Sequence, residues 1–117
     1  MGEGSAIRDK SFRFAVRVVK LAQHLQREHS EYVLSRQVLR AGTSVGANVE
    51  EARAGQSRKD FIAKMAVASK EARETLYWIR LLIETGYLTA EHAEPLKGES
   101  EELVRLLTAI VKTSQEQ

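Results

Sequence analysis

Apolar residues recur along this chain every three or four positions, and no segment shows the sustained apolar–polar alternation of a β-strand. This spacing is typical of amphipathic helices. It predicts four helices, at residues 9–27, 31–53, 57–85 and 89–112. Because the predicted links are short, we expect an all-α fold, an antiparallel up-down four-helix bundle over residues 9–114, with flexible tails at 1–8 and 115–117.

Segment 37–61 is nearly free of bulky side chains, yet it carries clear helix signals. Gly42 and Gly46 lie four residues apart inside the predicted helix, where each costs about 1 kcal/mol relative to alanine. The pair therefore predicts a neighbouring helix that approaches closely. Gly55 suits a left-handed residue after the helix end, and Ser57 matches the capping pattern at the start of the next helix.

The later helix boundaries carry comparable signals. Gly86 closes the third predicted helix, and Thr89 suits the cap of the fourth. Pro95 either falls within the first two turns of the fourth helix or restarts it.

A row of basic residues follows one side of the first predicted helix. The residues fall four, seven, eleven and fourteen positions after the first, and no acid lies between the first and the last. This basic ridge consists of Arg13, Arg17, Lys20, His24 and Arg27. It is a candidate nucleic-acid-binding surface, because charge alone attracts phosphates; the alternative is a solvated helix face. No aromatic residue interrupts the ridge, so the pattern does not suggest base stacking.

The chain carries more apolar helix surface than one small core requires. On a helical wheel, apolar residues cover more than half of the circumference of the first helix. They also cover most of the circumference in the second half of the third helix. We expect homo-oligomer assembly through this excess surface, and the alternative is an unusually wide intramolecular core. The predicted interface residues on the third helix are Tyr77, Trp78, Leu81 and Leu82.

A polar seam borders the apolar stripe of the second predicted helix. It consists of Gln37, Arg40, Ser44, Asn48 and Glu51. The seam either lines a ligand-binding cleft or is structural, with Arg40 paired to a carboxylate and Ser44 and Asn48 hydrogen-bonded across a helix contact.

The composition narrows the classes of function. The chain of 117 residues has a net charge of +2 and no cysteine, which excludes disulfides and thiolate metal sites and suits the cytoplasm. We see no signal peptide and no membrane span. The histidines at 24, 29 and 92 lack metal-ligand spacing. We therefore expect no metal, no cofactor and no enzymatic activity. Basic residues dominate the front of the chain and acidic residues the back.

The stretch RAGTSVGANVEEA at residues 40–52, followed by QSRKDF at 56–61, resembles the bacterial four helix bundle protein family, also called 23S rRNA-intervening-sequence proteins. The similarity extends over residues 10–112 and includes AVASKEARETLYWIR at 66–80. One departure is Glu50, where many members carry Ala. That extra carboxylate weakens a phosphate-binding interpretation of the polar seam.

The resemblance implies a non-enzymatic protein. The family is similar to the accessory protein of diversity-generating retroelements, a homopentamer that binds nucleic acid and a reverse transcriptase. It thus implies a homo-oligomer, a pentamer, that acts as an RNA-directed nucleic-acid-binding accessory protein. The alternative is a protein–protein interaction scaffold that docks an acidic partner through the same ridge and binds no RNA or DNA.

Overall fold

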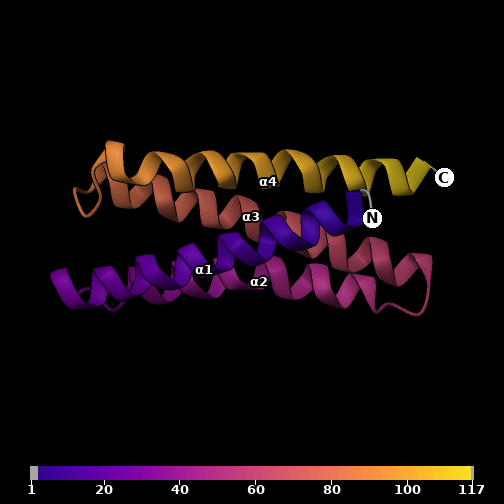
Figure 1. Ribbon diagram of the computed structural model, residues 1–117, viewed down its shortest axis with the longest axis horizontal. Coiled ribbons are helices and arrows are strands. Elements are labelled where there is room, and N and C mark those ends of the chain that lie inside the picture. The colour runs from indigo at the N-terminus through magenta and orange to yellow at the C-terminus, as the bar shows by residue number, and fades with distance from the viewer. Residues whose placement is uncertain (1–2, 117) are drawn as a thin grey trace.

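The computed structural model describes residues 3–116, with the side chains of residues 6–116. This part of the chain contains four helices and no strand: α1 (Glu3–His29), α2 (Leu34–Arg53), α3 (Arg58–Glu84) and α4 (Ala90–Glu116). Links of four, four and five residues join them, so consecutive helices run antiparallel (Figure 1). The molecule is elongated, with extents of 46 × 21 × 21 Å. The predicted all-α four-helix architecture is confirmed.

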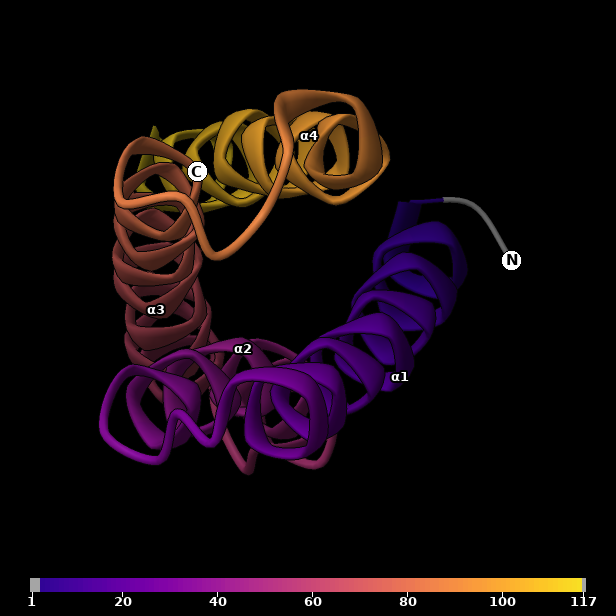
Figure 2. The same ribbon diagram turned by 90° about the vertical axis from the view of Figure 1, so that its left-hand side faces the viewer.

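The four helices surround the long axis in chain order (Figure 2). Each helix packs closely on the helix before it and the helix after it. The ring closes where α1 meets α4, and this contact is the least extensive of the four. We call it the α1–α4 seam. It brings the basic first helix beside the acidic last helix.

The core runs along the axis and is filled mainly by aliphatic side chains with one large ring, Phe14. Gly42 is buried against α1, and a Cβ atom added to it would lie 2.6 Å from Cγ1 of Val18. A Cβ atom added to Gly46 would lie 3.3 Å from the backbone oxygen of Ser11. Both glycines therefore let α1 approach α2 closely, which confirms the sequence prediction.

Most predicted caps are present. The backbone N–H of Asp60 donates to Oγ of Ser57 at 3.1 Å, and the N–H of His92 donates to Oγ1 of Thr89 at 3.2 Å. Gly86 ends α3 with a positive φ of 86°. Pro95 lies within α4 rather than restarting it.

The prediction for Gly55 is wrong, because it is not among the positive-φ residues. Its N–H donates to the backbone oxygen of Ala52 at 3.1 Å. A Cβ atom at Gly55 would lie 3.0 Å from that same oxygen, so the small residue relieves crowding in the turn. The left-handed residue of the first link is Ser30, with φ of 50°.

The first and last helices are longer than predicted. α1 already begins at Glu3, so residues 3–8 of the predicted tail are helical, and buried Ile7 ties them to the core. α4 continues to Glu116, and Arg58 donates to the backbone oxygen of Ser114 near that end. Residues 1, 2 and 117 of the predicted tails lie outside the described residues.

Helix α2 begins three residues later than predicted, at Leu34. Glu31 lies before it as a cap. Its carboxylate accepts hydrogen bonds from the backbone N–H groups of Leu34 at 3.0 Å and Ser35 at 2.8 Å. A carboxylate at a helix start satisfies unpaired donors and favours the helix dipole.

The buried face of α3 is wider than predicted. The apolar spacing of residues 57–85 predicts a core stripe that includes Leu76 and Ile83 but not Glu71, Thr75 or Leu82. In the structure Glu71, Thr75 and Leu82 are buried, whereas Leu76 and Ile83 are only partly buried. The reason is that α3 packs against both α2 and α4, which together cover a broader arc than one neighbour would. Within the described residues, no helix combines the length and apolar character needed to cross a membrane.

Candidate functional site

The basic ridge runs along α1 beside the α1–α4 seam. Arg13, Arg17, Lys20, His24 and Arg27 are all exposed. Two of the cations on this side of α1 contact acids of α4. Arg17 Nε lies 3.2 Å from Glu99 Oε1, and Lys10 Nζ lies 3.3 Å from Glu102 Oε2. The edge of the ridge nearest α4 is therefore neutralised in part.

The outer edge of the ridge keeps its charge. Among the side chains of residues 6–116, no ion pair engages Arg13, Lys20 or Arg27. These three residues fall within about 40° of one another on the helical wheel. They present a continuous cationic strip to solvent, of the kind that follows a phosphate backbone.

An exposed apolar stripe lies next to this strip. Phe12 is 67% exposed, Val16 40% and Val19 38%. Their spacing places them on one face of α1, about 60° to 120° from the centre of the ridge. The outer surface of α1 is therefore half cationic and half apolar, which suits a partner that offers both kinds of contact.

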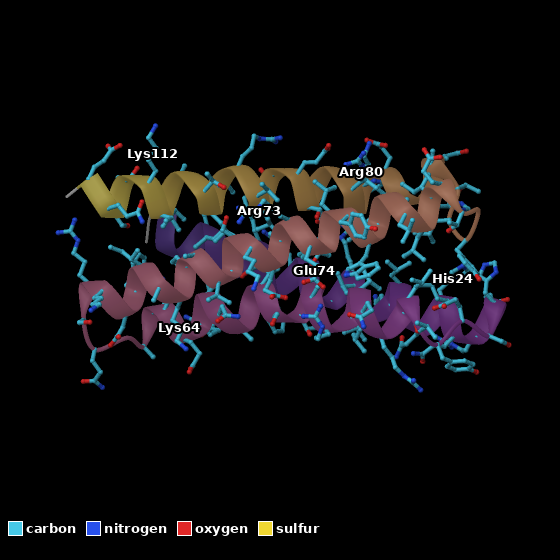
Figure 3. All side chains as sticks on the ribbon, turned by 180° about the vertical axis from the view of Figure 1, so that it is seen from behind. His24, Lys64, Arg73, Glu74, Arg80 and Lys112 are labelled. Atoms are coloured by element: carbon cyan, nitrogen blue, oxygen red, sulfur yellow. The ribbon has the colours of Figure 1, made fainter. Side chains whose placement is uncertain are left out.

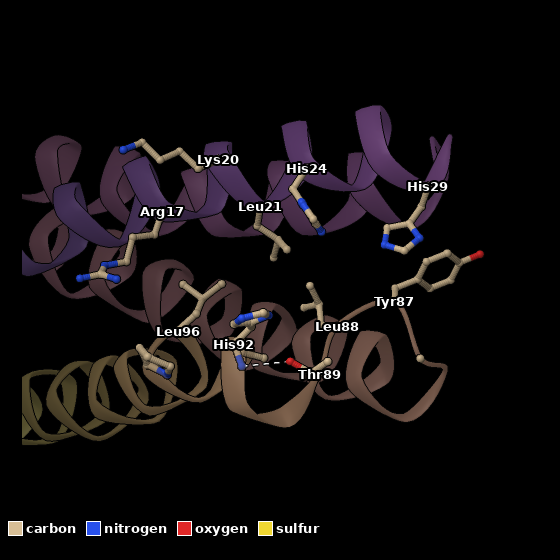
Figure 4. A pocket seen from close by; sticks show the side chains of 13 residues that line it. Arg17, Lys20, Leu21, His24, His29, Tyr87, Leu88, Thr89, His92 and Leu96 are labelled. Carbon is tan, nitrogen blue, oxygen red and sulfur yellow. Dashed lines mark hydrogen bonds between the residues drawn. The ribbon is translucent and has the colours of Figure 1, made fainter.

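A cavity of about 610 Å³ opens at one end of the α1–α4 seam, between the second half of α1, the α3–α4 link and the first turns of α4 (Figure 4). Its polar lining consists of Arg17, Lys20, His24, His29, Thr89 and His92. Three residues of the basic ridge, Arg17, Lys20 and His24, therefore border this cavity.

The fold brings His92 of α4 to the same cavity as His24 and His29 of α1. The rings of His24 and His29 meet edge to face at 5.6 Å, and His29 meets Tyr87 in the same way at 5.4 Å. Within the described residues, no group of three His, Asp or Glu side chains is arranged to hold a metal ion.

The polar seam of α2 is built around ion pairs with α3. Arg40 Nη1 donates to Glu71 Oε2 at 3.2 Å, and Arg40 Nη2 donates to Glu74. Trp78 Nε1 also donates to Glu74, at 2.9 Å. Figure 3 shows Glu74 on α3. The structural interpretation of Arg40 is confirmed, because its charge is satisfied by two carboxylates.

The rest of the polar seam makes local contacts. Gln37 accepts a hydrogen bond from Arg40 Nη2 at 3.4 Å. The Asn48 amide donates to the backbone oxygen of Ser44 at 2.8 Å, so this bond stays within α2 instead of crossing to another helix. Glu51 is exposed.

The predicted interface residues divide into two groups. Tyr77 is exposed, Trp78 and Leu81 are half-buried, and the two aromatic rings meet edge to face at 5.1 Å. Leu82 has no exposed surface and belongs to the core of the protomer, so its assignment to an interface is wrong. It lies on the side of α3 covered by its neighbours within the bundle.

The sequence matches the family model described as 23S rRNA-intervening sequence protein over residues 3–109. The chain belongs to this family. Its fold is similar to a crystal structure of a protein of unknown function from the S23 ribosomal protein family of Bacteroides thetaiotaomicron. That chain is 49% identical, with a TM-score of 0.91, and the match covers 94% of this chain and 98% of the other. A search of curated proteins gave no match.

The residue that departs from the motif of many 23S rRNA-intervening sequence proteins has a specific partner. Glu50 Oε1 lies 2.6 Å from Nε of Arg8. The extra carboxylate therefore joins α2 to the first turns of α1, outside the predicted polar seam.

Sequence reasoning missed Lys10, Glu99 and Glu102 at the α1–α4 seam, and His29, Tyr87 and His92 at the cavity. The acidic composition of the last thirty residues was a usable signal for the seam. The sequence carries no comparable signal for the cavity, because its residues meet only once the helices are arranged in a ring.

Proposed function

We propose that this family member is a non-enzymatic, homo-oligomeric accessory protein that binds nucleic acid, with RNA as its main target. The observation that carries the proposal is the solvent-exposed cationic strip of Arg13, Lys20 and Arg27, which no described acid neutralises. Such a strip attracts phosphates by counterion release and needs no base-specific contact. The family name, which refers to 23S rRNA, is in keeping with an RNA target.

The proposal includes no catalytic step. Ser57 caps α3 through its Oγ, and Glu50 is paired with Arg8, so both side chains have structural roles. Binding and positioning of a nucleic acid use the basic ridge without such chemistry. The setting we propose is the cytoplasm.

Assembly would multiply the cationic strip. We propose that Tyr77, Trp78 and Leu81 of α3 and the exposed apolar stripe of α1 form the contacts between protomers. Tyr and Trp are enriched in protein interfaces, and exposed apolar area of this kind is commonly buried by a partner. The pentameric stoichiometry follows from the resemblance to the retroelement accessory protein. A ring of protomers would join the separate strips into one larger cationic surface.

A second candidate function is a protein–protein interaction scaffold without nucleic-acid binding. The observation that favours it is the exposure of Phe12, Val16 and Val19 beside the ridge. A partner with acidic and apolar side chains would use both halves of the α1 surface, whereas a phosphate backbone uses only the cations.

Fluorescence anisotropy with labelled single-stranded RNA and DNA, repeated at several salt concentrations, separates the two candidates. Nucleic-acid binding predicts an affinity that falls steeply as salt rises, with a slope set by the number of phosphates neutralised. An absence of binding at low salt would contradict the proposed function and favour the scaffold.

A further inference from the structure

The cavity at the end of the α1–α4 seam has three chemically distinct zones (Figure 4). Arg17 and Lys20 supply positive charge at one end. Leu21, Leu88 and Leu96 form an apolar middle. His29 and Tyr87 lie at the far end, with His24 and His92 facing the middle from α1 and α4. The lining contains no carboxylate.

The positive end suits a small anion. Lys20 makes no ion pair among the described side chains, and Arg17 uses Nε toward Glu99, so its terminal nitrogens point elsewhere. Phosphate monoesters and carboxylates are the common biological anions of this size, and paired Lys and Arg donors favour phosphate.

The middle of the cavity suits a flat heteroaromatic ring more than an alkyl chain. The leucines cover its two faces, and imidazole groups at the walls both donate and accept hydrogen bonds at a ring edge. A heteroaromatic ring offers these exposed imidazoles hydrogen-bond partners, whereas an alkyl chain offers them none. The volume of about 610 Å³ is in the usual range for small-molecule sites, about 300–1,000 Å³.

We propose that this cavity binds a nucleoside monophosphate, either free or as the phosphorylated end of an RNA strand. Its phosphate lies at Lys20 and Arg17, and its base lies between the leucines, bordered by His24 and His92. The strand-end form rests on the proposed function, because the cationic strip would then hold the nucleotides that follow. The free-nucleotide form does not depend on it.

The three histidines provide a direct readout. They are the only histidines in the chain, and all three line the cavity. Their imidazole C–H signals in a proton NMR spectrum therefore report on this cavity without isotope labels. Trp78, the only tryptophan, contacts Glu74 away from the cavity and serves as an internal control.

The experiment titrates the full chain with AMP, adenosine and inorganic phosphate. We expect AMP to shift the histidine signals saturably while the Trp78 indole signal stays in place. Adenosine and phosphate alone should each bind at least about tenfold more weakly, since each fills only one zone. Equal shifts from phosphate and AMP, or no histidine shift with millimolar AMP, would overturn the proposal.

Two exposed residues of the same ridge give a matched pair of variants. Lys20→Ala should weaken AMP binding about tenfold, the usual effect of losing a charge-assisted hydrogen bond. Arg27 lies two helical turns after Lys20 on the same side of α1, but it does not line the cavity. Arg27→Ala should therefore leave AMP binding unchanged. Equal AMP affinity in both variants would overturn the placement of the phosphate.

RNA oligonucleotides with a 5′-phosphate and a 5′-hydroxyl distinguish the two sources of the nucleotide. Tighter binding and histidine shifts with the phosphorylated strand indicate the strand end. Shifts with AMP but no difference between the strands indicate a free nucleotide. If RNA fails to bind at all while AMP shifts the histidines, the cavity proposal stands and the proposed function fails.

Discussion

Gly42 lies so close to Val18 that a Cβ atom on the glycine would stand 2.6 Å from the valine Cγ1. Alanine at this position must push α1 and α2 apart or distort Val18. We expect Gly42→Ala to lower the free energy of unfolding by about 1–3 kcal/mol, the range for overpacking a core, although alanine is the better helix former. Urea denaturation at a fixed protomer concentration measures the change.

Gly98 in α4 provides the matched control, because a Cβ atom there would meet nothing within 4 Å. Gly98→Ala should raise the free energy of unfolding by up to about 1 kcal/mol through helix propensity alone. If both alanine variants shift stability in the same direction, close packing is not the reason for glycine at position 42.

The acids of the α1–α4 seam should hold back nucleic-acid binding. Glu99→Gln combined with Glu102→Gln removes two negative charges that lie within 3.3 Å of Arg17 and Lys10. We expect RNA affinity to rise severalfold at low salt, while the unfolding free energy falls by about 1 kcal/mol per partly exposed pair. Anisotropy titrations and urea denaturation measure the two effects. Glu51→Gln with Glu84→Gln, an equal charge change away from α1, should not raise the affinity as much.

Reversal of charge on the cationic strip should abolish most RNA binding. Arg13→Glu with Lys20→Glu removes two phosphate contacts, so the salt slope should fall by about 2 and the affinity by more than about tenfold. Both side chains are exposed, so the fold should be unchanged by circular dichroism. Lys59→Glu with Lys64→Glu on α3 carries the same change in net charge. Equal losses in both double variants would reveal an effect of overall charge rather than of the ridge.

The exposed and buried parts of the α3 apolar surface should respond differently to substitution. Tyr77→Asp with Leu81→Asp is expected to shift the mass in light scattering from an oligomer to the 13.1 kDa protomer. Leu82→Ala should instead lower the unfolding free energy by about 2–5 kcal/mol, since it opens a cavity in the core. A wild-type mass of one protomer would contradict the proposed assembly.

Arg40 neutralises Glu71, which is only 8% exposed. Arg40→Leu should therefore cost about 1–3 kcal/mol of unfolding free energy, because it leaves a largely buried carboxylate without its cation. Arg36→Leu removes an exposed arginine from the preceding turn of the same helix and should change stability by less than about 0.5 kcal/mol. Thermal unfolding of the two variants at one pH gives the comparison.

The sequence pattern predicted what is decided locally. The caps at Ser57 and Thr89 and the end of α3 at Gly86 depend on a few neighbouring residues, and each is present. Gly42 and Gly46 also revealed a close helix contact, because glycine inside a helix is costly without one. The family resemblance also rests on a short continuous stretch of the sequence, residues 40–61.

The sequence pattern did not predict the features that depend on which helices become neighbours. Glu71 is polar and yet buried, because Arg40 of α2 faces it. Leu82 was assigned to an interface, since a single apolar stripe could not show that α3 has a neighbour on each side. The pairing of Arg17 with Glu99 joins residues 82 positions apart, and the cavity gathers three histidines from both ends of the chain.

The ring of helices follows the order of the chain, so α1 and α4 alone join distant parts of the sequence. Proteins with mostly local contacts fold quickly, commonly in microseconds to milliseconds. We expect α2 and α3 to form an early hairpin, and closure of α1 on α4 to be the last and most easily reversed step. The same opening that admits a ligand would then be the point where unfolding begins, and native-state hydrogen exchange would show earlier loss of protection in the two outer helices than in the middle pair.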